Sequence, residues 1–260
     1  MSQELVLLPP WRSVQLVGRG VFIELLRRKD LYVLAFFMGL FLLGVAIVRL
    51  VGIENAATAT FLLNLGLTLA YFSAHLLTLL LTARQMPDEV ENRTLYPLLA
   101  KPLERRHLLA GKWAAATAGG TLVYAALFLV AWGFTPRYHA YSTGCLLQML
   151  LLQPVSIGML SAFALCGSLF MPRAVNLVVL LTLFMGGSAV AGLLSARLRP
   201  AFAWVASYLP RFSDLNLTMR YTDGIGALGA GEFLAIAAYA LIFTVLALSL
   251  AAWRFERRAL

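Results

Sequence analysis

Six runs of this 260-residue chain contain no Asp, Glu, Lys or Arg, and each is close to or above the length that crosses a lipid bilayer. The runs are residues 31–48, 56–83, 113–134, 140–171, 174–196 and 233–253. A helix needs roughly 18–20 apolar residues to span the hydrocarbon, and a backbone in lipid must satisfy its own hydrogen bonds. The runs also lack the alternation of barrel strands. The sequence therefore predicts an all-α integral membrane protein with six transmembrane helices.

The basic residues are distributed unevenly between alternate connections. With the amino terminus in the cytoplasm, 15 of the 21 Lys and Arg residues lie on the inner side and 6 on the outer side. Cytoplasmic loops carry an excess of Lys and Arg, so we expect both termini in the cytoplasm and a bacterial inner-membrane location. The net charge of +9 then reflects topology and attraction to anionic lipid, rather than binding of nucleic acid.

We expect the first thirty residues to form a distinct cytoplasmic region, followed by a six-span domain at residues 31–260. Residues 13–29 place an apolar stripe on one face of a helix, so we expect an amphipathic helix in the inner leaflet. A cytosolic extension of the first span is the alternative. Several charges precede that span, which favours a signal anchor over a cleaved signal peptide.

Small residues recur at helical spacing inside the spans, as at Gly66, Ala70 and Ala74, and we expect those faces to pack against other helices. Pro154 within the fourth run indicates a kink or tilt that serves either as a gate or as an accommodation of length. Cys145 and Cys166 share that run and lie ~30 Å apart along a helix, too far for a disulfide.

The outer connection at about residues 197–232 is rich in aromatic residues that suit a membrane interface, and it predicts short helices on or dipping into the outer leaflet.

Several nominal site motifs lack the context that their chemistry needs. The "GIGALG" at residues 224–229 follows no buried strand and is better explained as a turn, and "GKW" at 111–113 lacks the rest of a phosphate-binding loop. His75, His107 and His139 lack metal-ligand spacing, and for His75 a structural hydrogen bond to another helix is favoured over a substrate contact. We therefore expect no cofactor, no metal and no ATP site in this chain.

The charged segment 84–112 is too long and too rich in leucine for a simple connector. Pro87, followed by Asp88, Glu89 and Glu91, is typical of a helix start, because proline loses no hydrogen bond there and carboxylates favour the positive end of the helix dipole. Basic residues gather toward the return to the membrane. This pattern predicts a helix–turn–helix hairpin with a docking surface.

The sequence "DEVENRTLYPLLAKPLERRHLLAGKW" at residues 88–113 resembles the segment after the second span of type-2 ATP-binding-cassette (ABC) permeases. The match is to an acidic pair, an Arg-Thr-Leu, a Leu-Leu-x-x-Pro, an arginine and a Gly-Lys. These are Glu89 and Glu91, Arg93, Thr94 and Leu95, Leu98, Leu99 and Pro102, Arg105, and Gly111 and Lys112. Glu104 departs from the small polar residue often found before the arginine. The segment looks closest to copper-enzyme maturation permeases that partner nitrous-oxide reductase. Gliding-motility and antibiotic-export permeases share it, so it implies no substrate.

The resemblance implies that the hairpin couples the spans to a separate cytoplasmic ATPase, which binds the ATP, and that the chain itself is not an enzyme. It also implies a second permease copy or a homologue, because two sets of six spans form the pathway of an exporter. An alternative is a mechanotransmission subunit that acts on an extracytoplasmic protein. An intramembrane enzyme is disfavoured, because the runs hold no convergent set of titratable groups beyond His75.

Overall fold

The computed structural model describes residues 20, 30–52, 55–91, 105–135, 141–197 and 210–257, and the regular elements in these segments are all helices. The long elements are α2 (Asp30–Val51), α3 (Ala56–Glu91), α5 (Arg105–Phe134), α6 (Thr143–Ser168), α7 (Arg173–Arg197) and α10 (Ala230–Arg257). Two short elements, the 3₁₀ helix η1 (Phe212–Leu215) and α9 (Thr218–Thr222), lie between α7 and α10. The prediction of an all-α protein is confirmed for these residues.

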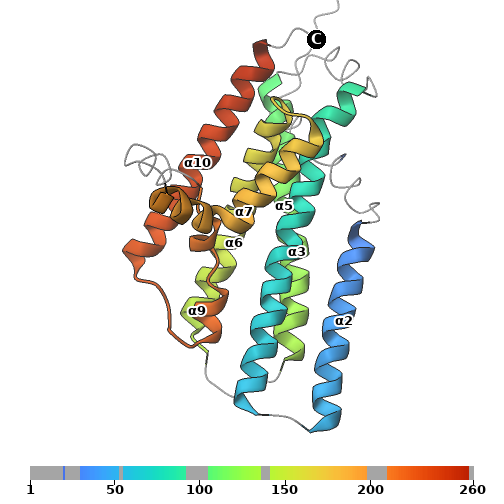
Figure 1. Cartoon of the computed structure of the whole chain (residues 1–260), viewed down its shortest axis with the longest axis vertical. Helices are drawn as coiled ribbons and strands as arrows, with labels where there is room; N and C mark the ends of the chain where they lie inside the picture. The colour runs from blue at the N-terminus through green and yellow to red at the C-terminus, as the bar shows by residue number, and fades with distance from the viewer. Residues whose placement is uncertain are drawn as a thin grey trace, which may run out of the picture.

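The long helices α3, α5, α6 and α10 run side by side along the long axis of the molecule, and α2 lies at one edge beside α3 (Figure 1). Helix α6 contacts α3, α5, α7 and α10. Most of its side chains are buried, in contrast to the exposed apolar side chains of α2 and α10. An apolar helix surrounded by others needs no polar face, and apolar side chains on outer helices face lipid in a membrane protein. Helix α6 is therefore the centre of the bundle.

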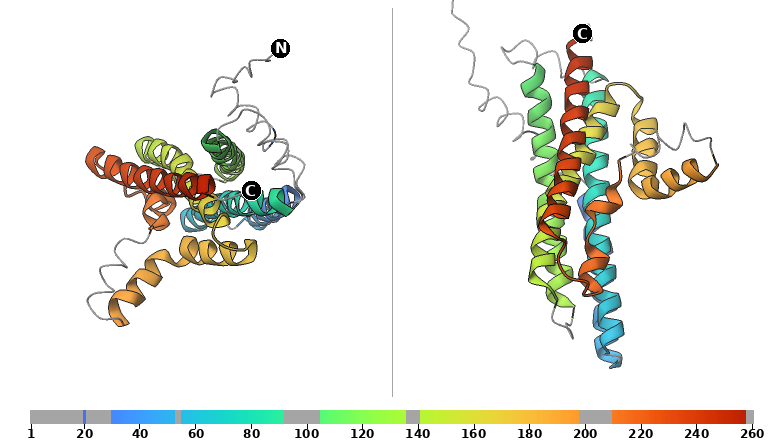
Figure 2. Two further views of the ribbon diagram at one scale, coloured as in Figure 1. Left: turned by 90° about the horizontal axis from the view of Figure 1, so that it is seen from above. Right: turned by 90° about the vertical axis from the view of Figure 1, so that its left-hand side faces the viewer.

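Four of the described helices are long and apolar enough to cross a membrane: α3, α5, α6 and α10. Helices α2 and α7 contribute shorter apolar stretches, Ala35–Val51 and Arg173–Gly186. Figure 2 shows the second half of α7 turning away from the axis of the bundle. Gly186, Gly187 and Ser188 stand at the middle of this helix, and such residues commonly accompany helix bends. The count of six crossings remains an expectation.

Small residues let the helices approach closely, as their spacing predicts. Ala70 and Ala74 of α3 are fully buried. A methyl group at Gly66 would lie 2.5 Å from the ring of Phe41 in α2 and 2.9 Å from Ala131 in α5. Gly66 is therefore the point where α2 and α5 both meet α3.

The connection between α7 and α10 is held deep in the bundle. The hydroxyl of Tyr71 donates to the carbonyl of Phe212 at 3.3 Å, and Asn64 Nδ2 donates to Thr222 Oγ1 at 3.1 Å. Tyr71 lies fifteen residues along α3 from Ala56, which is about 22 Å of helix. Residues 212–222 therefore pack along the side of α3, and the prediction that this connection lies on or dips into the outer leaflet stays an expectation.

Two sequence predictions at the ends of elements have clear outcomes. Gly224 and Gly226 adopt φ of +70° and +89° in the turn before α10, which confirms the turn interpretation of "GIGALG". The prediction that a new helix starts at Pro87 is wrong, because Pro87 lies inside α3, which continues to Glu91. Met86 and Gln85 are buried at this point, so packing extends the helix past the proline.

The expected amphipathic helix at residues 13–29 lies outside the described residues.

Candidate functional site

The end of α3 and the start of α5 flank the segment that the sequence marks as a docking hairpin. Glu89 and Glu91 lie in the last turn of α3, and Arg105 is the first residue of α5. The intervening residues 92–104 lie outside the described part of the chain. They include the predicted contacts Arg93, Thr94, Leu95, Leu98, Leu99 and Pro102.

A compact apolar cluster joins the end of α3 and the start of α5 to α6 and α10. We call it the end cluster. Its buried members are Met86 of α3, Leu108 and Leu109 of α5, Ala162, Leu165 and Cys166 of α6, Leu169, which directly follows α6, and Ala247, Ala251 and Phe255 of α10. The end of α3 and the start of α5 are therefore packed against α6 and α10, which are distant from them in the sequence.

Gly111 and Lys112 lie in the first two turns of α5, within the described residues. Lys112 is 1% exposed, and its Nζ lies 3.9 Å from the sulfur of Met86 in α3. Gly111 is also buried. Lys112 is therefore buried between α3 and α5.

Polar contacts fix α5 to α6 just beyond Lys112. Trp113 Nε1 donates to the carbonyl of Gly158 at 2.9 Å, and the hydroxyls of Thr117 and Ser161 are 2.9 Å apart. A methyl group at Gly158 would lie 3.4 Å from Thr117 and 3.5 Å from the Trp113 ring, so the two helices are in van der Waals contact here. The start of α5 is thus held in a defined register on α6.

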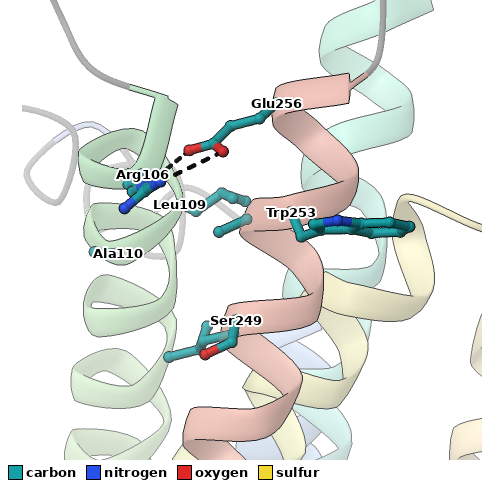
Figure 3. Close-up of a pocket in the computed structure, with 8 residues that line it drawn as sticks. Arg106, Leu109, Ala110, Ser249, Trp253 and Glu256 are labelled. Atoms are coloured by element: carbon teal, nitrogen blue, oxygen red, sulfur yellow. Dashed lines mark hydrogen bonds and ion pairs between the residues drawn. The ribbon is translucent and has the colours of Figure 1, made fainter.

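A groove runs between α5 and α10 at the same end of the bundle (Figure 3). Its volume is about 440 Å³, and its lining includes Leu109, Ala110, Ser249 and Trp253. Arg106 of α5 and Glu256 of α10 point toward one another across it, with Nε and Oε1 2.5 Å apart (Figure 3). Both side chains are exposed, at 69% and 40%, so the ion pair contributes little stability, about 0–1 kcal/mol.

The sequence alone does not predict the pairing of Arg106 with Glu256. The two residues are 150 positions apart, and neither the helical spacing nor the family-like motif links them. The pair places the last turn of α10 beside the first turn of α5.

His75 lies in the middle of the bundle and is fully buried. Its Nδ1 is 2.8 Å from the carbonyl of Tyr71, and its Nε2 is 2.9 Å from the hydroxyl of Ser156 in α6. A carbonyl only accepts, so Nδ1–H is the donor and the neutral ring accepts from Ser156. Its ring also stacks on Phe184 of α7. The predicted structural hydrogen bond between helices is confirmed.

No group of three His, Cys, Asp or Glu side chains in the described residues is arranged to hold a metal ion. Cys145 and Cys166 are both free and buried, as their separation along α6 predicts. Within the described residues, the end cluster packs the end of α3 and the start of α5 against α6 and α10.

Comparison with known families gives one match. A family model described as "ABC-2 family transporter protein" matches residues 22–260, which is nearly the whole chain. No curated protein matches the chain.

Proposed function

The chain belongs to the ABC-2 family of transporter proteins and is a membrane permease subunit, and we propose that it couples ATP hydrolysis by a separate ATPase to export of a substrate. The observation that best supports this proposal is the end cluster. It joins the two flanks of the hairpin to α6 and α10 through fully packed side chains.

The end cluster is suited to transmit a push from the hairpin. Packed interiors resist compression, and coupling between distant sites travels through rigid elements in contact. When an ATPase moves the hairpin, α3 and α5 move with it, and Leu108 and Leu109 bear directly on α6 and α10. The force reaches the central helix of the bundle by this path.

In this proposal the charged residues of the hairpin fix the position of the ATPase on the permease. Glu89, Glu91, Arg93 and Arg105 supply polar contacts, and Leu95, Leu98 and Leu99 supply packing. Thr94 and Pro102 shape the turn, while Gly111 and Lys112 hold its base between α3 and α5. The functional unit contains two permease copies, or this chain and a homologue, each with six spans and with both termini in the cytoplasm of an inner membrane.

The test is a charge reversal that keeps the net charge of the hairpin, Glu91→Arg combined with Arg93→Glu. Insertion should survive, because exposed charges change stability by only about 0.5 kcal/mol. Complementarity to a fixed partner surface is reversed, which costs about 2 kcal/mol or more of binding, or over tenfold in affinity. We expect a folded, correctly inserted permease that no longer copurifies with its ATPase subunit.

A matched control reverses two exposed charges that lie far from the hairpin along the chain, Arg211→Glu with Glu232→Arg. This variant should copurify with the ATPase as the parent protein does. The coupling role of the hairpin is refuted if the reversed hairpin retains the ATPase and its ATP-driven response.

A further inference from the structure

A second groove, lined by apolar side chains, lies between α6, α7 and α10. Its volume is about 490 Å³, and its lining includes Phe163 of α6, Phe170, Val179 of α7, and Leu246 and Leu250 of α10. The last four of these are large hydrophobic side chains that are 45–60% exposed, so the groove is open at the surface of the bundle.

The polar atoms in the lining are already engaged. Asn176 is the one lining residue with a side-chain nitrogen or oxygen, and its Nδ2 donates to the carbonyl of Ala164 at 2.9 Å. This bond fixes α7 to α6 along the floor of the groove. A molecule bound in the groove would therefore contact mainly apolar side chains.

The groove is about two thirds as long as one leaflet of the bilayer is thick. Its lining on α10 extends from Phe243 to Leu250, which is about 10 Å of helix, compared with roughly 15 Å for half of the bilayer hydrocarbon. Its volume of about 490 Å³ and its apolar walls suit an acyl chain.

One end of the groove is positively charged. The guanidinium of Arg254 lies 5.5 Å from the centre of the Phe170 ring, and Arg254 is one turn of α10 beyond Leu250. Helix α7 begins at Arg173, three residues after Phe170, so the positive end of its dipole lies at the same end. The lining itself contains no acidic residue.

We propose that this groove binds a phospholipid with an anionic headgroup, with one acyl chain in the groove and the phosphate beside Arg254. The proposal goes beyond the ATP-coupled function and does not require it, because it rests only on the membrane location of the chain. Apolar walls hold the chain by burial, and one arginine at a membrane surface strengthens binding of an anionic lipid about fivefold.

The experiment uses the full-length protein in phosphatidylethanolamine vesicles that contain a small fraction of phosphatidylglycerol with a photoactivatable acyl chain. Irradiation should label peptides of α6, α7 and α10 that line the groove. Leu246→Trp fills the groove and should abolish this labelling. Leu241→Trp is the matched control, because Leu241 is similarly exposed on α10 but does not line the groove.

The headgroup is tested with Arg254→Gln and with photoactivatable phosphatidylcholine of the same acyl chain. Arg254→Gln should lower phosphatidylglycerol labelling about fivefold, to the level of phosphatidylcholine, and Arg254→Lys should retain most of it. Equal labelling of the two lipids in the parent protein overturns the anionic preference. Equal labelling of the two tryptophan variants overturns the site. If Leu246→Trp instead separates subunits and leaves the labelling unchanged, the groove is an interface between copies and the proposal fails.

Discussion

Gln148 and Gln153 lie five positions apart on α6 in opposite hydrogen-bonding environments. The amide of Gln148 donates to the carbonyl of Leu228 at 2.9 Å and accepts from its N–H at 2.7 Å. Gln153 is fully buried, and neither atom of its amide has a partner in the described residues. A buried amide without partners costs about 1–3 kcal/mol, so the two glutamines should respond oppositely to the same substitution.

We expect Gln153→Met to raise the free energy of unfolding by about 1 kcal/mol, because methionine has a similar shape and no amide to desolvate. Gln148→Met should lower it by about 1–3 kcal/mol, because both backbone groups of Leu228 lose their partner. Thermal unfolding of the purified protein in one detergent measures both. An equal loss of stability in the two variants would show that the Gln153 amide is satisfied in the membrane.

At the scale of the elements, α3, α5 and α6 approach closely at Gly120. A methyl group there would overlap the hydroxyl of Thr78 in α3 and lie 2.9 Å from Ile157 in α6. Thr78 cannot turn away freely, because its hydroxyl donates to the carbonyl of Ala74 at 2.8 Å. Gly120 therefore sets the spacing of three helices.

We expect Gly120→Ala to lower the free energy of unfolding by about 1–3 kcal/mol, as overpacking of a dense core does. Adding Thr78→Ala should restore about 0.5–3 kcal/mol of this loss, because it removes the atom that the new methyl group meets. Gly133→Ala on the same helix is the control and should cause no overpacking, since no atom of another helix lies within 4 Å of its new methyl group. Independent, additive effects of the Gly120 and Thr78 substitutions would refute this packing contact.

These contacts show which features the sequence can predict. Charge-free runs predict the long helices, and spacing of small residues predicts the buried faces at Gly66, Ala70 and Ala74, because both are properties of one segment. Identifying the partner of Gly120 requires knowledge of a neighbouring helix. The same holds for the Arg106–Glu256 pair across 150 positions. The helix start at Pro87 was mispredicted because local signals compete there with packing of Met86 that the sequence does not show.

At the scale of the whole molecule, the proposed coupling requires that the four helices at the hairpin end move together. The end cluster packs Leu108 and Leu109 of α5 against α10, which contributes Ala251 and Phe255. Arg106 and Glu256 meet at the rim of the same contact. Packed interfaces of this kind shift as units rather than deform continuously. A link across the rim should therefore leave the motion free.

We expect a protein with Arg106→Cys and Glu256→Cys, bridged by a flexible and reductively cleavable bis-maleimide, to keep its coupling to the ATPase. The native Cys145 and Cys166 are buried and should not react. The measurement is the ATPase rate of the complex before bridging, after bridging and after cleavage of the linker, with the single Arg106→Cys variant treated in parallel. Equal rates in all three states support a rigid end in which α5 and α10 move together. A rate that falls on bridging and recovers on cleavage would show that α5 separates from α10 during the cycle, and the force path through the end cluster would be wrong.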